Sequence, residues 1–410
     1  MPKVMLLLPT STYRAHDLLL AAQRLGVQVV VGSERGQVLE PQTTGTTLTV
    51  DLWAPEVAVA QIQEYHHQFP LDAVIGLDDE TTLIAAAAAQ RLGLLHNPPS
   101  TVEVLGNKVA FRRMQRRAGL PCPDFRVIAR DADPARQARR VDYPCVLKPT
   151  FLAASRGVIR ADDENTFIAA FERIAQLLAD PELQRRGGSE ADRVLVEDYV
   201  PGLELALEGI LCDGELRILA LFDKPDPLVG PYFEETIYVT PSRLPGESQD
   251  EVVAAVLAAI KASGLQEGPV HAEVRLNQHL ATVIEVAPRA IGGHCARVLR
   301  FTAGMSLEEI ILRHALGQDV RSLERAEEAA GVMMIPIPSA GTLRAVEGVD
   351  AAAAVAGVDE VEITIHPGQR VVPLPEGNRY LGFIFARASH PESVETALRQ
   401  AHQCLRFEIC

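Results

Sequence analysis

The strongest constraint on the fold lies near residue 280, where two short strand-like segments each carry one glutamate. His271–Arg275 and Val283–Arg289 are separated by seven residues. If they pair as a hairpin centred on His279, Glu273 and Glu285 face each other on one side. Facing carboxylates repel unless a cation lies between them, and oxygen ligands of this kind suit magnesium. The alternative is an exposed acidic strand pair.

Length and charge limit the function classes. A chain of 410 residues is too long for one ordinary core, so we expect about three domains. The net charge of −15 argues against a nucleic-acid partner, because no basic tract is present to displace counterions.

Targeting and redox signals indicate an ordinary cytoplasmic protein. The apolar stretch Val4–Leu8 is far too short for a signal peptide or a membrane span, and it predicts a buried first strand. Six cysteines show neither CxxC pairs nor metal-ligand spacing, which indicates free thiols in a reduced compartment.

The first hundred residues alternate in the α/β manner. Strands are expected at 3–8, 27–31 and 72–76, with helices at 15–25 and 80–92. This pattern predicts a small parallel sheet covered by helices, without a GxGxxG dinucleotide fingerprint. Asp78, Asp79 and Glu80 follow a strand end, where ligands commonly bind; the alternative is a helix N-terminus that favours negative charge.

The middle of the chain mixes helices and strands. The capping box Ser100–Glu103 predicts one helix that runs to about Ala118. Antiparallel strands are expected at 204–212 and 215–222, joined by the turn Asp213-Gly214. Other expected elements are strands at 143–148, 193–197, 331–337 and 381–386, and helices at 162–178, 248–263, 307–316 and 392–404.

Two lysines and a small-residue loop suggest a phosphate site. Lys108 lies early in the helix after the capping box, and Lys148 ends an apolar strand before a proline. The loop Thr150–Val158 that follows could cradle phosphate with its backbone N–H groups. The strand Val194–Glu204 then runs into a polar turn, where backbone groups can pair with an adenine edge. Each lysine alone could be a solvated charge, but their combination with the carboxylate pair is a less common coincidence.

This order of parts resembles the ATP-grasp superfamily over about residues 1–315, and it is similar within that superfamily to the L-amino acid ligases that make dipeptides. The supporting stretches are Lys148–Val158, Phe222–Pro225, Gly230–Thr236, Glu285–Gly293 and Gly382–Ala386. The resemblance implies an ATP-grasp fold, α/β with an α+β central part. The expected domains are an N-terminal Rossmann-like pre-ATP-grasp domain at 1–99, the ATP-grasp domain at 100–318 and a small C-terminal α+β domain at 319–410.

Site residues are carried over from the resemblance position by position. Residues implied to bind ATP are Lys108, Lys148, Ser155, Arg156, Gly157, Glu197, Asp198, Tyr199, Val200 and Glu204. Glu273 and Glu285 would bind Mg²⁺, with Mn²⁺ as a substitute. Arg289 and Lys148 would be catalytic. Many relatives have Asn where this chain has Ala287, which removes one metal ligand and weakens a second metal site.

Substrate contacts are implied at Arg289, Gly292, Gly293, His294 and His271, although His271 could instead be a strand histidine satisfied by a neighbour. Glu234 and Glu235 are candidates for a substrate ammonium group, against a solvated loop.

The implied reaction turns a carboxylate into an acyl phosphate that an amine then attacks, giving a dipeptide or amide. The expected partners are small carboxylates and amines, with a homodimer left open. Two alternatives remain: activation of bicarbonate or formate, and a nucleotide-binding regulatory protein without turnover.

Overall fold

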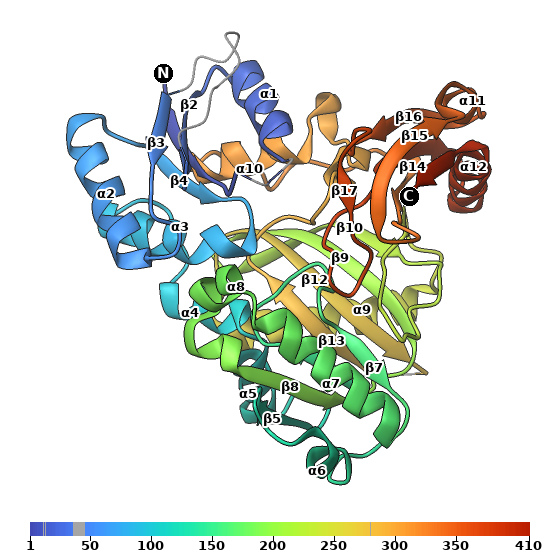
Figure 1. Cartoon of the computed structure of the whole chain (residues 1–410). Helices are drawn as coiled ribbons and strands as arrows, with labels where there is room; N and C mark the ends of the chain where they lie inside the picture. The colour runs from blue at the N-terminus through green and yellow to red at the C-terminus, as the bar shows by residue number, and fades with distance from the viewer. Residues whose placement is uncertain (11, 13, 36–45, 279) are drawn as a thin grey trace.

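The N-terminal lobe is a parallel sheet covered by helices. The computed structural model describes residues 1–10, 12, 14–35, 46–278 and 280–410, and this lobe is blue in Figure 1. The sheet has the order β3-β2-β1-β4, and every neighbouring pair is parallel. Its elements are β1 Lys3–Leu7, α1 Ala15–Leu25, β2 Gln28–Ser33, β3 Thr46–Thr49, α2 Pro55–Gln68, β4 Ala73–Gly76 and α3 Asp79–Leu92. No helix in the described part of the chain is both long enough and apolar enough to span a membrane.

A second, antiparallel sheet of order β5-β8-β6-β7 forms the lower lobe in Figure 1. Its elements are β5 Phe125–Ala129, α6 Pro134–Ala138, β6 Cys145–Pro149, β7 Ile159–Ala161, α7 Glu164–Leu178, α8 Pro181–Gly187 and β8 Arg193–Asp198. Helix α7 covers this sheet because Phe167, Phe171 and Ile174 recur on one helical face and enter its core.

The largest sheet runs across two of the expected domains. It has eight strands in the order β13-β12-β9-β10-β11-β14-β18-β16. The strands are β9 Leu203–Cys212, β10 Glu215–Asp223, β11 Ile237–Thr240, β12 Gly268–Asn277, β13 Leu280–Ala287, β14 Ala329–Ile335, β16 Val358–Ile363 and β18 Gly382–Ala388. A division at residue 319, which we retain as a proposal, therefore separates strands of one continuous sheet.

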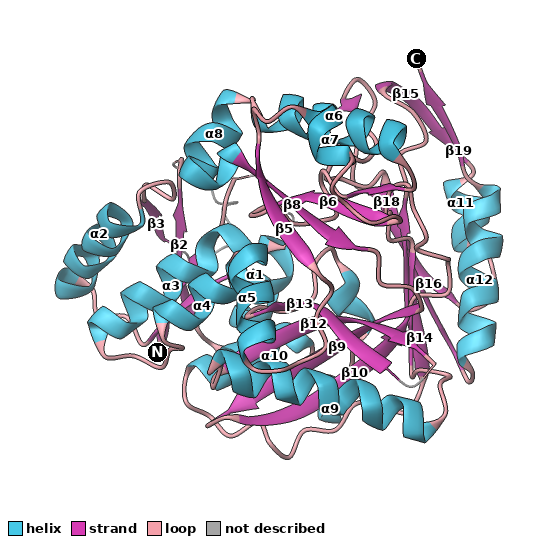
Figure 2. Ribbon diagram, turned by 90° about the horizontal axis from the view of Figure 1, so that it is seen from below, coloured by secondary structure: helices cyan, strands magenta, loops and turns pink. Residues whose placement is uncertain are grey.

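Helices and a small sheet complete the fold (Figure 2). Helix α9 packs on β12 and β13, α10 packs on α1, and α12 packs on β14 and β18. These elements and the remaining ones are α9 Gly246–Ser263, α10 Leu307–Ala315, β15 Gly341–Glu347, α11 Val349–Ala353, β17 Arg370–Val371, α12 Pro391–Cys404 and β19 Arg406–Ile409.

Two hairpins behave as the sequence predicts. Asp213 and Gly214 join β9 to β10 with φ of 54° and 81°, the pair of positive values that a tight hairpin turn needs. In the β12–β13 hairpin Glu273 pairs with Glu285, so the predicted facing carboxylates are confirmed. His279, the expected centre, lies outside the described residues.

The register of the β12–β13 hairpin depends on a bulge. Next to the turn Asn277 pairs with Leu280, and this register continues to Val274 opposite Val283. Extended by one more residue, it would place Glu273 opposite Ile284. A bulge between Val274 and Glu273 makes Ile284 the extra residue of β13. The register therefore shifts by one, and Glu273 lies opposite Glu285.

The single helix predicted from residue 100 to about 118 is wrong. The structure has α4 Pro99–Gly106 and α5 Lys108–Arg117, with a break at Asn107. The Asn107 carboxamide accepts hydrogen bonds from the N–H groups of Val109 and Ala110, both at 3.0 Å, and so caps a new helix. Gly106 also has a weak helix propensity. As a result Lys108 lies at the first position of α5, and its N–H donates to the Thr150 carbonyl at 2.9 Å.

Candidate active site

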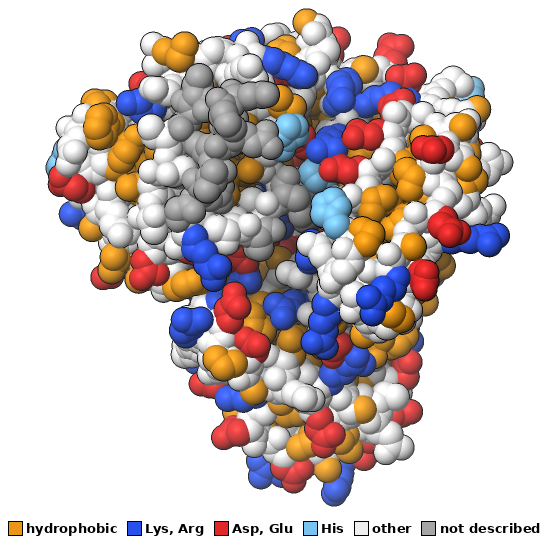
Figure 3. Space-filling view, turned by 45° about the horizontal axis from the view of Figure 1, so that its top comes forward, with side chains coloured by type: hydrophobic (Ala, Val, Ile, Leu, Met, Phe, Trp, Pro, Cys, Tyr) orange, Lys and Arg blue, Asp and Glu red, His pale blue; other side chains and the backbone are white. Residues whose placement is uncertain are grey.

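A cavity of about 540 Å³ lies where the lobes meet. The loops after β1 and β4 form one wall, and the loop after β6 with the end of β8 forms another. Strands β12 and β13 form its floor, and residues 378–380 of the C-terminal segment also reach it. Lys and Arg side chains lie on several sides of this region in Figure 3.

Lys148 belongs to a cluster of one carboxylate between two cations. Glu197 receives the Lys148 ammonium on one oxygen and the Arg112 Nε on the other, the latter at 2.6 Å. Burial works to raise the pKa of Glu197, but the two cations overcome it and lower that pKa to about 2. Arg112 also donates to the Ile284 carbonyl at 2.9 Å, which ties α5 to β13. The cluster contains two positive charges and one negative charge, so it has a net positive charge.

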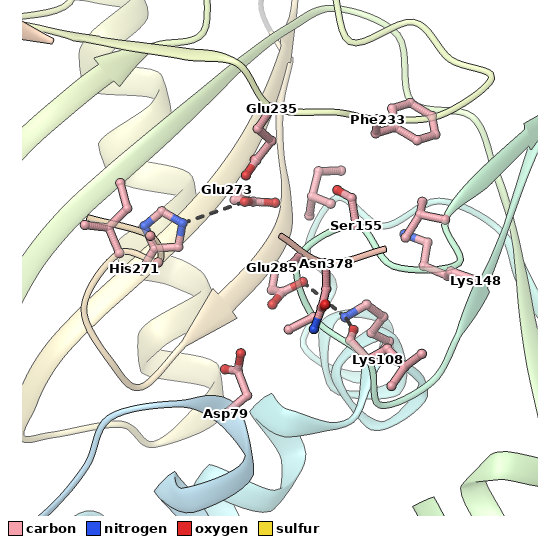
Figure 4. Close-up of a pocket in the computed structure, with 18 of the residues that line it drawn as sticks. Asp79, Lys108, Lys148, Ser155, Phe233, Glu235, His271, Glu273, Glu285 and Asn378 are labelled. Carbon is pink, nitrogen blue, oxygen red and sulfur yellow. Dashed lines mark hydrogen bonds and ion pairs between the residues drawn. The ribbon is translucent and has the colours of Figure 1, made fainter. Parts of the chain in front are cut away.

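Lys108 approaches the carboxylate pair from α5, as Figure 4 shows. Its Nζ lies 3.2 Å from Glu285 and 2.8 Å from the Leu152 carbonyl. Both predicted lysines therefore line the same cavity, although they come from different elements.

The loop between β6 and β7 has backbone that is unusual for its residues. Ala154 and Ser155 adopt positive φ of 55° and 53°, a conformation that costs non-glycine residues roughly 1–3 kcal/mol. Both line the cavity, as predicted for Ser155. Gly157 has a φ of 74°, and a Cβ there would lie 2.8 Å from Pro149.

Arg156 and Gly157 are placed differently from the expectation. They are not among the described residues that line the cavity. The Arg156 Nε donates to the Glu376 carbonyl and the Gly157 N–H to the Pro375 carbonyl, both at 2.8 Å. They connect the loop to the C-terminal segment, and Arg173 adds an ion pair to Glu376. Any role in ATP binding would thus be indirect.

Three residues at the end of β8, predicted to bind ATP, line the cavity: Asp198, Tyr199 and Val200. The Tyr199 ring stacks on Phe233 with centroids 6.4 Å apart. Arg275 donates to the Tyr199 hydroxyl at 3.1 Å and so holds this wall against β12.

A second cluster reverses the charge pattern of the first. The Lys224 Nζ lies 2.8 Å from Glu204 and 3.4 Å from Glu273, and it also contacts Glu235. Arg275 bonds the Glu204 carboxylate at 2.7 Å. Two cations therefore face three carboxylates. Burial, opposed by Lys224, raises the pKa of Glu235 to about 7.

These carboxylates allow two candidate metal sites. Glu204, Glu235 and Glu273 place oxygens within 4.8 Å of one another. The Lys224 ammonium contacts all three of these carboxylates, however, and a positive charge inside the group would repel a metal ion. The pair Glu273 and Glu285 is the better fit, because its register aligns two oxygen donors beside the lysines that suit phosphate.

His271 lies at the end of this acidic region. Its Nδ1 is 3.2 Å from Glu208 and its Nε2 is 3.7 Å from Glu273, the second pair being drawn in Figure 4. Burial disfavours the charged ring, but the two carboxylates raise the pKa of His271 to about 9. Glu208 in turn accepts from the Ile291 N–H at 3.1 Å, which positions the backbone before Gly292 and Gly293. Both glycines line the cavity.

Arg289 is fixed by the N-terminal lobe. Its Nε and one Nη lie 2.8 and 2.7 Å from the two carboxylate oxygens of Asp79, at the start of α3. Burial opposes the charge of Arg289, but the bidentate pair raises its pKa above the ordinary value. Sequence reasoning offered a ligand role or a helix-end role for the acidic run 78–80. The helix-end interpretation is confirmed, because Asp78 is the N-cap residue of α3 and Asp79 and Glu80 lie in its first turn. Asp79 also links two distant segments.

His294 does not line the cavity as expected for a substrate contact. It is buried, its Nδ1 lies 3.3 Å from Asp17 of α1, and its ring meets Phe383 edge to face. Asp17 also accepts from Arg297 at 2.9 Å. We therefore place His294 in an interlobe contact.

Most basic side chains of the cavity already have acidic partners. The pairs are Lys108 with Glu285, Arg112 and Lys148 with Glu197, Arg186 with Glu80, Arg275 with Glu204 and Arg289 with Asp79. Within the described residues, Arg14 and Arg379 line the cavity without such a pair.

Two side chains of the site were not predicted from the sequence, Arg112 and Lys224, and for Asp79 the pairing with Arg289 was not predicted. Arg112 is one of several arginines on a basic helix, and in the sequence it looks like the others. Its burial in the structure distinguishes it from them. Lys224 lies in the quoted stretch Phe222–Pro225, so its position just after a strand was an available signal. The partner of Asp79 lies 210 residues away and left no local signal.

Comparison with known proteins identifies the domains of this chain. Three family models match: an ATP-grasp N-terminal domain over residues 19–95, an ATP-grasp domain over 141–298 and L-amino acid ligase C-terminal domain 2 over 333–409. An uncharacterized protein, y4rH of Sinorhizobium fredii, is 24% identical over 97% of this chain and 78% of its own length. The alanine–anticapsin ligase of Bacillus amyloliquefaciens is 27% identical over 63% of this chain, which spans only 56% of that relative.

A solved structure matches over the whole chain. The L-amino acid ligase from Bacillus licheniformis superposes with a TM-score of 0.86 at 24% identity, covering 100% of this chain and 99% of that one. This likeness confirms the predicted fold class. Together with the family models, it also confirms the superfamily resemblance. The chain belongs to the ATP-grasp superfamily and carries the C-terminal domain of the L-amino acid ligases.

Proposed function

We propose that this protein is an ATP-dependent carboxylate–amine ligase that forms a dipeptide or amide and releases ADP and phosphate. The observation that carries the proposal is the charge polarity of one cavity. The end with Lys148 and Arg112 has two cations for one carboxylate. At the end with Lys224, the cations Lys224, Arg275 and His271 face one carboxylate more than their own number: Glu204, Glu208, Glu235 and Glu273. An amino acid condensing with ATP brings both phosphate and ammonium, which match these two ends.

The positive end would hold the nucleotide. Lys148 and Lys108 are positioned for the phosphates, and the backbone N–H groups near Ser155 would cover them. Asp198, Tyr199 and Val200 would meet adenine and ribose. Glu197 would act by holding Lys148, because both of its oxygens are engaged by cations.

Glu273 and Glu285 would hold Mg²⁺, with Mn²⁺ as a substitute, and the ion would neutralise phosphate charge during transfer. The chain supplies Ala287 where many relatives supply Asn, so we propose a weaker second metal site. Before metal binding, Lys108 and Lys224 neutralise the two carboxylates.

The negative end would recognise the first amino acid. Glu235 is positioned to accept hydrogen bonds from its ammonium group, which places its carboxylate toward Arg289. Arg289, held by Asp79, would stabilise charge that develops on the phosphorylated carboxylate. Gly292 and Gly293 leave room for close substrate approach.

The alternative substrates fit this polarity less well. Bicarbonate and formate have no cationic group, so the carboxylates around Lys224 would repel them. A regulatory protein without turnover is also disfavoured, because Lys148, Arg289, Glu273 and Glu285 are all retained around one cavity.

The test is ADP release with ATP and Mg²⁺ across amino acids singly and in pairs, with bicarbonate and formate in separate wells. Pair-dependent ADP release with a matching condensation product is the expected result. A response to bicarbonate or formate alone, or no ADP with any pair, would contradict the proposal.

Location and assembly belong to the same proposal. All six cysteines are free thiols, which suits the cytoplasm. The proposed partners are small molecules, and a homodimer stays open to measurement by light scattering.

A further inference from the structure

An amino acid as second substrate brings an anion for which the proposed mechanism has no partner. The ATP phosphates meet the lysines, and the carboxylate of the first amino acid becomes the reacting group at Arg289. The α-carboxylate of the second amino acid would stay charged, and burying it unpaired is costly. A cation of the cavity that has no acidic partner among the described residues would neutralise it most directly.

Two cavity side chains meet that requirement, Arg14 and Arg379, and they come from opposite walls. In the described residues neither forms an ion pair. The other basic side chains of the cavity are paired as given above. A guanidinium suits this task because its planar donors match a carboxylate.

Arg14 is the better positioned of the two. It is partly buried at the start of α1, and its Nη1 donates to the Leu77 carbonyl at 2.6 Å. Asp79, two residues further on, holds Arg289. The segment Leu77–Asp79 therefore fixes both guanidinium groups relative to each other. Arg379 is exposed and has no hydrogen bond within the described residues.

The charge of Arg14 also acts on a carboxylate that positions the backbone before Gly292 and Gly293. Burial raises the pKa of Glu208, and this effect is opposed first by the His271 hydrogen bond and more weakly by the charge of Arg14. Glu208 binds the Ile291 N–H directly before Gly292 and Gly293. Arg14 and the glycine segment line the same cavity.

We propose that Arg14 binds the α-carboxylate of the second substrate and makes the enzyme select amino acids over simple amines. This inference rests on the proposed ligase function and deepens it. The product would then be a dipeptide with a free carboxylate.

The test compares one second substrate with its amide, for example L-alanine with L-alaninamide, at a fixed first substrate. The wild type should show a KM for the acid at least about tenfold below that for the amide. Arg14→Gln should raise the KM for the acid about tenfold or more and leave the KM values for amide and ATP within about threefold. Arg14→Lys should restore part of the preference, since it keeps the charge.

Arg379→Gln is the matched control and should retain the preference for the acid. The inference is overturned if wild type does not discriminate acid from amide, if Arg14→Gln discriminates as wild type does, or if Arg379→Gln alone loses the preference. No ADP with any carboxylate–amine pair would instead refute the ligase function itself, so the two failures are distinguishable. Thermal melting checks that each variant is folded.

Discussion

The two ion clusters of the cavity are charge inversions of each other. Around Glu197 two cations surround one carboxylate, whereas three carboxylates surround Lys224, and one of them also binds Arg275. The first cluster is buried, and in the second Lys224 is buried while its three carboxylates are half-buried, so these charges need internal partners. The comparison shows how one site can attract phosphate at one end and ammonium at the other.

The clusters also differ in how strongly their carboxylates are held in the charged form. Glu197 is held firmly in its charged form, with a pKa of about 2. Glu235 shares one lysine with two other carboxylates, so burial raises its pKa to about 7. The first cluster is therefore a structural anchor for Lys148, and the second should respond to ligands and to pH.

The largest effect is expected for Glu197→Gln. It leaves Lys148 and Arg112 buried without their carboxylate, and we expect the free energy of unfolding to fall by about 3–5 kcal/mol. Urea denaturation measures this change. Glu64→Gln, at an exposed ion pair, should change it by less than about 1 kcal/mol.

The same variant tests how the contribution of Glu197 to stability depends on acid pH. The pKa of Glu197 is lowered from 4.5 to about 2, so its contribution is complete above pH 4.5 and is lost as the pH falls toward 2. The stability difference between wild type and Glu197→Gln should shrink over that range. A stability difference that stays constant over this pH range would show that the ionised Glu197 carboxylate does not cause it.

Lys148→Met should mainly affect catalysis. Removing this phosphate contact should lower kcat/KM for ATP by about 10²- to 10³-fold, while Arg112 still neutralises Glu197. Lys261→Met, at an exposed lysine on α9, is the matched control. A loss below about tenfold in ADP release would remove Lys148 from the catalytic set.

Glu235→Gln tests the opposite cluster. Because the pKa of Glu235 is raised to about 7, its charged form gains population as the pH rises from 6 to 8. The KM of the first amino acid should fall over this range in wild type. In the variant that KM should be about tenfold higher at pH 8 and lack this trend. Glu234→Gln, outside the cavity lining, should behave as wild type.

The smallest effect is expected at the contact between the C-terminal segment and the loop after β6. The Arg173–Glu376 pair is well exposed, so Glu376→Ala should change the free energy of unfolding by less than about 1 kcal/mol. Denaturation and the KM for ATP measure this together. A change in KM above about threefold would show that the contact shapes the ATP site.

Local pattern was enough to predict much of the fold. The alternation of strands and helices predicts the N-terminal sheet, and Asp213-Gly214 predicts the hairpin turn between β9 and β10 of the largest sheet. Both features depend on neighbours in sequence. The helix expected from residue 100 to 118 failed for a local reason as well. Asn107 ends the first helix and caps a new one within the span predicted as a single helix.

By itself, the sequence determined the superfamily, the two lysines, and the facing pair Glu273 and Glu285. These follow from residue types at fixed spacing along strands and loops. Only the tertiary structure decided which charges are neutralised. Asp79 reaches Arg289, Arg112 reaches Glu197 and Lys224 gathers three carboxylates across distant segments. Charge balance in a buried site depends on distances of a few ångströms, and the order of residues along a chain does not specify those distances.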